Sequence, residues 1–486
     1  MPSSASHDAS HLIHNLPGKR AKEDNMKRDY DVVVIGSGAA GLAAAVTAAD
    51  SGASVIVLEA DDKVGGSSRL SGGHFYAAGT SIQREAGILD DTPDDMFSYY
   101  MTLNQWNVEP AVARTYCDSA APTFEWLRSL GVVYKPERVY ISGIDTVPRG
   151  HPPEGEGLAV VRVLDSERIK RGVDLALMTR ADRLIEEDGE IVGVAAGDQE
   201  VGCGAVVIAS GGFGHNKEFI EKYWPDAHEQ GEGVWAISGP KAMGDGITLG
   251  EQVGATLGGY NRGLLLLTPG FTKDLEVAVP PWVILVSREG RRFASEMAPY
   301  TVMAGLFKRN GGLAYAIFDE AARQDADAMP IGPSWTTEAL LERADSGEVL
   351  RADTLEELAE LCKINAAPLA GTVQKYNEDC ATGVDTAYFK PTGLRAITEP
   401  PFYAVEVRPA VIAWTGCGLR VDSETQVIAN NELPIDNLFA AGEAMGTLHG
   451  DRYIGGGGSY GPAVTFGRIA GRNAATAAAK GAGLME

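Results

Sequence analysis

The chain has 486 residues, enough for two or three domains, and its 44% hydrophobic and 22% charged residues are typical of a globular protein. Its 42 basic and 66 acidic side chains give a formal net charge of −24. A charge of that sign repels phosphate backbones and anionic lipid, so we expect neither nucleic acid nor a membrane surface as a partner. The five scattered cysteines form no CxxC pair, so the sequence supports no disulfide framework and no metal site, and it favours a reducing, cytoplasmic compartment.

Residues 1–27 are rich in Ser, His, Asp, Asn and Lys and lack the apolar centre of a signal peptide, so we expect a disordered tail. No later stretch approaches the ~20 continuous apolar residues that cross a bilayer, so no membrane span is expected. Glycine is the compositional outlier, with 59 residues against a background of about 7%. The glycines gather in clusters, and these clusters carry the motifs.

The first cluster follows an apolar, β-branched run at residues 30–36, which predicts a buried strand. Gly36, Gly38 and Gly41 form a GxGxxG motif that opens an Ala-rich helix, and a second predicted strand ends at Glu59. The first glycine permits a tight turn, the second lets a pyrophosphate approach the backbone, and the third allows close helix–strand packing. The helix N-terminus supplies N–H donors, and Glu59 can accept hydrogen bonds from a ribose. This unit predicts a dinucleotide site.

The remaining chain alternates strands and helices. The pattern from 90 to 135 is helical, with Met96, Phe97, Tyr100 and Met101 on one face. Further expected elements are a hairpin at 188–190, a buried strand at 205–210, helices at 354–362 and 369–377, a strand at 437–442 and a last helix at 461–479. We therefore expect an α/β fold in which a Rossmann-type domain from both chain ends, residues 28–233 and 396–486, holds an inserted domain, residues 234–395.

A second glycine-rich loop, residues 63–73, follows Glu59. Here the sequence resembles the FAD-dependent fumarate reductase and 3-ketosteroid dehydrogenase superfamily, and the resemblance extends from Tyr30 onward through residues 209–214, 243–247, 290–296 and 441–443. It implies FAD as cofactor and an inserted α+β cap that closes over the isoalloxazine. The residues expected to bind FAD are Gly36, Gly38, Ala39, Ala40, Gly41, Glu59, Ala60, Gly65, Gly66, Ser67, Ser68, Ser71, Gly72, Gly73, Ala181, Ser210, Gly211, Asp245, Gly442, Glu443, Ser459 and Tyr460.

Within this resemblance, Ala181 is expected near the adenine and Glu443 on the ribityl chain. Members with covalent flavin have a His where this chain has Ser67 and Ser68, so we expect non-covalent FAD. In the fumarate reductase pattern, an Arg that shuttles a proton lies four residues after the Glu of the GxRF…E motif, and a second Arg in the C-terminal glycine segment and a His bind the dicarboxylate. This chain has Tyr300, Tyr453 and Trp414 there, which disfavours a dicarboxylate substrate, although Arg452 or Arg262 could meet a single carboxylate.

The replacements resemble 3-ketosteroid Δ1-dehydrogenases. That resemblance implies that Tyr300 abstracts the proton α to a ketone, while the Tyr453 hydroxyl and the Gly457 N–H bind the ketone oxygen and flavin N5 accepts the β hydride. Tyrosine has a pKa of about 10, so Tyr300 needs help as a base, and Tyr134 or Tyr140 is the candidate for the assisting tyrosine.

We therefore expect α,β-dehydrogenation of a small-molecule cyclic ketone, with electrons passed to an unidentified acceptor. The ketone is a 3-oxosteroid or a smaller ring such as 4-oxocyclohexanecarboxylate. The alternatives are an enoate reductase that runs the reaction backwards and a non-enzymatic flavin carrier. His74 and His449 are interpreted as structural or flavin-edge residues rather than as acid–base catalysts. The sequence does not indicate an oligomeric state.

Overall fold

The computed structural model describes residues 26–270, 273, 278–329, 331–446 and 448–483. The expected disordered tail lies outside these residues, except for Met26 and Lys27. The Met26 N–H donates a 2.9 Å hydrogen bond to the Glu187 carboxylate. The chain forms two compact units: unit 1 contains residues 1–225, 237–263 and 414–486, and unit 2 contains residues 226–236 and 264–413.

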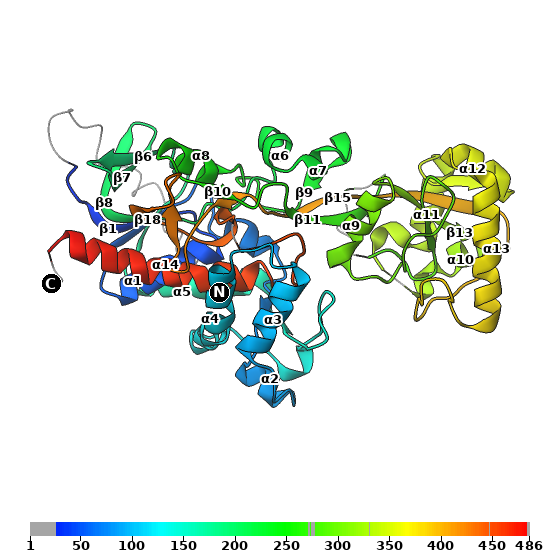
Figure 1. The fold of residues 1–486 in the computed structure, drawn as a ribbon, viewed down its shortest axis with the longest axis horizontal. Coiled ribbons are helices and arrows are strands. Elements are labelled where there is room, and N and C mark those ends of the chain that lie inside the picture. Colours follow the sequence, from blue (N-terminus) through cyan, green and yellow to red (C-terminus); the bar gives the residue numbers. More distant parts are fainter. Residues whose placement is uncertain (1–25, 271–272, 274–277, 330, 447, 484–486) are drawn as a thin grey trace, which may run out of the picture. The chain divides into compact units, whose positions relative to one another are not determined.

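Unit 1 is built on an eight-stranded sheet (Figure 1). Its central strands are parallel, and Val33 of β1 pairs with Ile56 of β2 on one side and Val206 of β8 on the other. These strands are continuous apolar runs because both faces of the sheet are covered. In spatial order the strands are β17 (Gln426–Ile428), β18 (Pro434–Ala440), β8 (Gln199–Ile208), β1 (Tyr30–Ile35), β2 (Val55–Leu58) and β5 (Asp174–Ala176), with β7 (Glu190–Ala196) beside β8 and β6 (Arg183–Glu187) beside β7.

Helices and short strands complete unit 1. The helices are α1 (Ala39–Asp50), α2 (Ser81–Glu85), α3 (Pro93–Leu103), α4 (Pro110–Ser129), α5 (Glu156–Lys170), α6 (Lys217–Tyr223), α7 (Pro225–His228, which continues into unit 2), α8 (Asp245–Gln252) and α14 (Tyr460–Gly481). The short strands are β3 (Phe75–Tyr76) with β4 (Gly150–His151) and β10 (Leu257–Gly258) with β16 (Gly418–Leu419). The helical pattern predicted for 90–135 is thus two helices, broken where Gln105 and Trp106 take left-handed backbone angles. Met96, Tyr100 and Met101 are buried together as predicted.

The last helix, α14, lies along α1 (Figure 1). Only small residues separate the two backbones: a Cβ atom at Gly467 would overlap the Ala40 carbonyl, and one at Gly471 would overlap the Ala44 carbonyl. The distance between two packed helices depends on the side chains at their contact, so glycine opposite alanine gives the closest approach. This contact ties the C-terminus of the chain to its first βαβ element.

Unit 2 has a mixed sheet with helices on both faces: β13 pairs antiparallel with β12 and β15, and β9 pairs parallel with β15. Along β13, Ala316 and Phe318 belong to a core with Phe307 of α9 and Leu340 of α11, whereas Ile317 faces a second core formed with α12 and α13. This alternation is the period of two expected for a strand covered on both sides. The sheet contains β11 (Gly263–Pro269), β15 (Phe402–Thr415), β13 (Ala314–Asp319) and β12 (Ile284–Val286), with β14 (Leu350–Ala352) and β9 (Trp235–Ala236) on β15. The helices are α9 (Tyr300–Arg309), α10 (Glu320–Gln324), α11 (Thr337–Asp345), α12 (Leu355–Cys362) and α13 (Ala366–Thr382).

The predicted fold class, α/β with a Rossmann-type domain and an α+β inserted domain, is confirmed. The compact units, however, have boundaries other than 234 and 395. Residues 237–263 pack with unit 1, since α8 contacts β6 and β16, where Gly250 lies against Leu419. Residues 396–413 pack with unit 2, because β15 pairs with β13 along Phe402–Val407.

The α1–α14 contact predicts a strong response to one methyl group. Gly467→Ala should lower the free energy of unfolding by about 1–3 kcal/mol, because the added carbon has no space against the α1 backbone. The matched control is Gly371→Ala, also inside a helix, where a Cβ atom meets nothing within 4 Å; this change should be neutral or stabilising by up to about 1 kcal/mol. Denaturant unfolding of both variants measures the difference. Equal effects would show that α14 does not depend on this close approach.

Candidate functional site

The loop between β1 and α1 separates the roles of its three glycines. Gly36 has φ +100°, and a Cβ atom there would lie 2.5 Å from the Ala209 carbonyl oxygen, whereas one at Gly41 would overlap the Gly36 carbonyl oxygen. A Cβ atom at Gly38 would meet only the Ser68 hydroxyl, at 3.6 Å. The first and third glycines are therefore required by packing, and the second leaves room beside the N-terminus of α1. That arrangement fits a pyrophosphate bound to helix N–H groups.

Glu59 ends β2 and is held in place by the protein. The N–H and hydroxyl of Ser37 donate to its Oε2 atom at 2.9 and 2.5 Å, and the Asp61 N–H donates to Oε1 at 2.8 Å. Its own carbonyl accepts a 2.8 Å bond from the Thr179 N–H, which brings the segment containing Ala181 beside it. Ala60 follows Glu59 at the same strand end. A carboxylate oxygen has several lone pairs, so the buried Glu59 side chain can still accept from ribose hydroxyls.

The second glycine loop is joined to the first. The Gly65 N–H donates to the Ser37 hydroxyl at 3.1 Å, and the Ala39 N–H, at the start of α1, donates to the Ser68 hydroxyl at 3.0 Å. Gly66 has φ +44° and borders open space. Two serines fix the rest of this loop: Ser67 accepts a 2.9 Å bond from the Gly239 N–H, and Ser71 donates to the Ser68 carbonyl and accepts from the Gly73 N–H. Next to them, Gly72 lies beneath the His74 ring.

A buried hydroxyl and an open glycine follow β8. The Ser210 hydroxyl is buried and has no hydrogen-bond partner among the described residues, and Gly211, with φ +78°, has nothing within 4 Å of an added Cβ atom. Gly246 packs against Ser210, which brings α8 to this strand end, where the Asp245 carboxylate accepts a 3.0 Å bond from Arg180. A buried polar atom without a protein partner beside open space indicates a site for a polar ligand.

Gly442 and Glu443 follow β18 and are the predicted cofactor residues at the end of that strand. Gly442 has φ +72° and packs against Ala40 of α1. The Glu443 Oε1 atom accepts hydrogen bonds from the N–H and the hydroxyl of Thr415, at 2.8 and 2.7 Å, and burial raises the pKa of the Glu443 carboxyl. The predicted cofactor residues from Gly36 to Glu443 thus gather at the carboxyl ends of β1, β2, β8 and β18, where open α/β sheets bind ligands.

Tyr453 lies at the N-terminus of α14. Its hydroxyl accepts hydrogen bonds from the Ser459 N–H at 2.9 Å and from the Ser459 hydroxyl at 3.0 Å. Ser459 was expected to bind FAD, but its hydrogen bonds here go to Tyr453. Tyr460, the first residue of α14, is buried and donates to the Gly157 carbonyl at 3.3 Å. Burial raises the pKa of Tyr453 to about 12, and the Ser459 bonds oppose that shift. Tyr453 is therefore a phenol at neutral pH, with a proton to donate.

Gly457 belongs to the same turn, four residues after Tyr453. It has φ +99°, and an added Cβ atom would lie 2.7 Å from the backbone between Phe75 and Tyr76. Its carbonyl accepts from the Gly461 N–H, while its own N–H has no acceptor within the described part of the chain. The Tyr453 hydroxyl and the Gly457 N–H are thus two hydrogen-bond donors of one turn.

The aromatic surroundings of Tyr453 carry no charge. The His449 ring is 4.3 Å from the Trp414 ring and 5.7 Å from the Tyr453 ring, and its Nδ1 atom is 3.1 Å from the Tyr100 hydroxyl. Burial lowers the pKa of His449 to about 3, so its imidazole is neutral. The sequence assigned Tyr100 only to a buried helix face, because a stripe at helical spacing carries no information about which hydroxyl reaches a distant loop.

Two arginines near this turn, Arg262 and Arg452, already form hydrogen bonds within the protein. The Arg262 guanidinium pairs with Asp451 at 3.3 Å and donates to the His449 carbonyl at 3.4 Å. Arg452 donates to the carbonyl of Asp451 at 3.0 Å and makes no ion pair among the described residues.

Of the two candidates for the assisting tyrosine, only Tyr140 lies at this turn. Its hydroxyl is 2.5 Å from His74 Nδ1, and it occupies the space that a Cβ atom at Gly456 would need. Tyr134 packs in the core, with its ring 4.4 Å from Phe124, and its buried hydroxyl has no partner among the described residues.

Tyr300 belongs to unit 2, where it is half-buried and begins α9 after Pro299. The loop before it is anchored by the buried Glu296, whose carboxylate accepts from the Leu285 N–H at 2.9 Å and from Arg292 at 2.8–3.0 Å. Lys390 is 3.2 Å from the same carboxylate.

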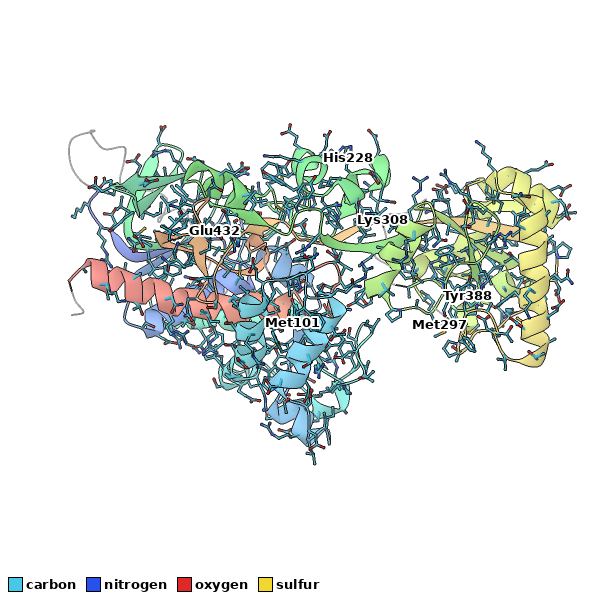
Figure 2. The ribbon with its side chains drawn as sticks, viewed as in Figure 1. Met101, His228, Met297, Lys308, Tyr388 and Glu432 are labelled. Carbon is cyan, nitrogen blue, oxygen red and sulfur yellow. The ribbon has the colours of Figure 1, made fainter. Side chains whose placement is uncertain are left out.

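The Arg292 guanidinium and its backbone carbonyl form further hydrogen bonds. Arg292 also donates to both oxygens of the Asp385 carboxylate, from Nη2 at 2.9 Å and from Nη1 at 3.2 Å. The Tyr388 hydroxyl donates to the Arg292 carbonyl at 2.8 Å (Figure 2 labels Tyr388). Glu296, identified only as part of a motif, is therefore an anchor for the loop that ends at Tyr300.

The part of the chain that the structure describes contains neither a metal-binding cluster nor a membrane-spanning helix. No cluster of three or more His, Cys, Asp or Glu side chains is placed to hold a metal ion there. Nor is any described helix both long enough and apolar enough to cross a membrane.

Comparison with known proteins agrees with this geometry. The family described as FAD binding domain matches residues 31–459. A fumarate reductase (cytochrome) of Shewanella frigidimarina is 32% identical, over 92% of this chain and 77% of that protein. A vinyl phenol reductase of Lactiplantibacillus plantarum is 30% identical, over 95% of this chain and 97% of that protein. The structure of a 3-ketosteroid-Δ4-(5α)-dehydrogenase from Rhodococcus jostii RHA1 aligns with a TM-score of 0.75 at 27% identity, over 94% of this chain and 100% of that one.

These matches span almost the whole chain and confirm the superfamily that the sequence resembles. They also confirm FAD as the cofactor, which the open glycines and the unpartnered Ser210 hydroxyl accommodate. The chain belongs to the FAD binding domain family and is an FAD-dependent oxidoreductase of the fumarate reductase and 3-ketosteroid dehydrogenase superfamily.

Proposed function

We propose that the protein dehydrogenates a cyclic ketone to the α,β-unsaturated ketone, with Tyr453 and Gly457 binding the ketone oxygen and Tyr300 removing the α proton. The observation that carries this proposal is the pair of donors in the glycine turn. The Tyr453 O–H, which accepts from Ser459 and keeps its own proton, and the Gly457 N–H, which has no acceptor among the described residues, suit one carbonyl oxygen.

The two donors explain how an unactivated C–H bond could react. Hydrogen bonds to a ketone oxygen favour the enolate that forms when the α proton leaves, and each such donor in a dry site is worth about 3–4 kcal/mol. When bound, FAD supplies the acceptor for the β hydride. Tyr300 opens α9, and a helix N-terminus favours a negative charge on a group near it, which is the direction that a phenolate base requires.

The surroundings of Tyr453 favour a substrate without charge at this end. Trp414 and the neutral His449 are apolar or uncharged neighbours, and Arg262 is already paired with Asp451. A flat ring ketone fits such an aromatic environment. The proposal covers a 3-oxosteroid and a smaller ring ketone such as 4-oxocyclohexanecarboxylate, whose carboxylate Arg452 could meet. The electron acceptor is a further small molecule or protein.

A second candidate is reduction of a C=C bond by the same site. Identity to the two reductases named above, at 32% and 30%, exceeds the 27% identity to the steroid dehydrogenase. The donors that stabilise an enolate serve both directions, because the forward and reverse reactions share one transition state. The direction then depends on whether the flavin is supplied oxidised or reduced.

Anaerobic mixing with saturated cyclic ketones and 3-oxosteroids tests the proposed function. We expect flavin bleaching by one class of ketone. Tyr453→Phe should slow bleaching about 10²–10³-fold through loss of an oxygen donor, and Tyr300→Phe about 10²–10⁴-fold through loss of the base, with FAD retained in both. The control is Tyr260→Phe, whose side chain is 61% exposed, and it should match the wild type.

Two other outcomes would contradict parts of the proposal. Near-normal bleaching by Tyr300→Phe would remove the base assignment. If no ketone bleaches the wild type but enones or fumarate reoxidise the dithionite-reduced enzyme, the reductase replaces the dehydrogenase.

The serines of the second glycine loop predict how FAD is attached. Ser67 and Ser68 occupy the loop where members with covalent flavin have a His, and their hydroxyls accept hydrogen bonds from the Gly239 and Ala39 N–H groups, respectively. We expect non-covalent FAD. Precipitation of the purified protein with acid should leave all of the yellow colour in the supernatant as FAD. Flavin that stays with the pellet after washing would show a covalent bond at another residue.

The buried His449 predicts a pH dependence of stability. Its pKa is about 3 in the folded protein and 6.5 when exposed, so between these values the unfolded chain binds a proton that the folded chain does not. Stability therefore rises with pH in this window, and lowering the pH from 7 to 5 costs about 2 kcal/mol through His449. In His449→Gln this part of the slope should vanish. Denaturant unfolding at both pH values measures it; equal slopes would mean that His449 is charged or exposed.

A further inference from the structure

Residues 448–456 carry Tyr453 but form no helix and no named strand. Most of this segment is nonetheless buried. Buried N–H and C=O groups need hydrogen-bond partners, and a segment outside regular structure must find them in side chains. The origin of those partners therefore shows which part of the chain holds Tyr453.

Two adjacent tyrosines of α3 donate hydrogen bonds to carbonyl groups of this segment. The Tyr100 hydroxyl donates to the Leu448 carbonyl at 2.9 Å, and the Tyr99 hydroxyl donates to the Ile454 carbonyl at 2.8 Å. Tyr100 is completely buried. The two hydroxyls bracket Tyr453, since they bond the chain five residues before it and one residue after it.

Asn104, which ends α3, fixes a third group. Its Oδ1 atom accepts from the Arg452 N–H at 2.9 Å, and its own amide donates to the Tyr100 carbonyl at 3.2 Å. It fits so closely that a Cβ atom at Gly450 would lie 2.5 Å from Oδ1. Met101, labelled in Figure 2, lies in the same helix and is buried beside these residues. The Asp451–Arg452 peptide, one residue before Tyr453, is therefore held by the end of α3 as well.

The positions of the two tyrosines are themselves fixed. The Tyr99 ring stacks on the Tyr76 ring at 6.4 Å, and Tyr76 donates its hydroxyl to the Asp145 carboxylate. Arg149, 2% exposed, pairs with Asp145 at 3.0 Å and with Asp91 at 2.6 Å. A buried, fully paired network of this kind has one favourable geometry, so it gives α3 a defined position.

We propose that α3 is a positioning element for the Tyr453 hydroxyl, and that Tyr99, Tyr100 and Asn104 act as positioning residues for carbonyl binding. None of their hydrogen bonds reaches the Tyr453 side chain; they act through its backbone. The inference rests on the proposed function for its link to ketone binding. A displacement of about 1 Å in a reacting group can cost about 10²-fold in rate, so three bonds that fix one backbone segment can matter for turnover.

The test compares Tyr99→Phe, Tyr100→Phe and the double variant with Tyr30→Phe. Each single change keeps the ring and removes the hydrogen bonds of one hydroxyl, which for Tyr100 include its contact with His449 Nδ1. Tyr30 is a matched control because its hydroxyl donates to Asp174 at 2.7 Å from the first residue of β1, the end of the strand away from the glycine loop. All variants should bind a full complement of FAD.

Two measurements judge the proposal. In anaerobic mixing with the ketone that bleaches the wild type, each single variant should reduce its flavin about tenfold more slowly, while reoxidation by an artificial one-electron acceptor stays unchanged. Hydrogen exchange should show faster exchange at the amides of 448–456 in these variants, and wild-type exchange in Tyr30→Phe.

Failure of this inference is distinct from failure of the proposed function. If a ketone bleaches the wild type and the α3 variants match Tyr30→Phe in rate and exchange, α3 does not position Tyr453. Equal slowing of both half-reactions would also overturn it, because that indicates a general structural loss. If no ketone bleaches the wild type, the proposed function fails. The role of α3 is then tested by reoxidation of the dithionite-reduced variants with an enone, which should be about tenfold slower than in the wild type, and by the exchange data.

Discussion

The close approach of α1 and α14 determines how unit 1 presents its site. Gly467 and Gly471 leave no side chain between the helices, and Gly442 packs against Ala40 near the start of α1. Both helices begin at the site: α1 opens beside Gly38, and α14 opens at Ser459 and Tyr460. A helix N-terminus carries about half a positive charge, and the contacts of Gly467 with Ala40 and of Gly471 with Ala44 show that the two helices run in the same direction. In a chain with a net charge of −24, these termini offer positive potential to a diphosphate without a cationic side chain.

The N-termini of α1 and α14 have different roles. At α1 the helix N-terminus and the open side of Gly38 suit the anionic part of FAD. At α14 the first N–H is already used, since Ser459 donates it to the Tyr453 hydroxyl. A hydroxyl that accepts hydrogen bonds becomes a stronger donor, because the accepted bonds stabilise the charge that remains when its proton is shared. The helix therefore acts on the substrate region through the oxygen of Tyr453 and not by direct contact.

Sequence reasoning succeeded where the cause is local. The strand–glycine–helix order fixes β1, α1 and β2, and the spacing of Gly36, Gly38 and Gly41 predicts their separate roles, because each depends on atoms a few residues away. It did not identify Tyr99, Tyr100 and Asn104, which bond a segment about 350 residues later, since periodicity reports that a face is buried but not what it touches. For the same reason it gave Glu296 no role of its own. The unit boundaries depend on β15, a single strand whose pairing with β13 could not be read from composition.

The chemistry of the two tyrosines follows from where each is placed. A pKa of about 12 makes Tyr453 unsuitable as a base and suitable as a donor, because the phenol is fully protonated at neutral pH and its oxygen is held by Ser459. A base must lose its proton, and so needs a different setting from the one that the buried turn provides. In the proposed reaction Tyr300 takes that role from another unit, on a loop fixed by the Glu296–Arg292 pair. The start of α9 offers such a setting, because the positive end of a helix favours the charged form of a phenolate near it.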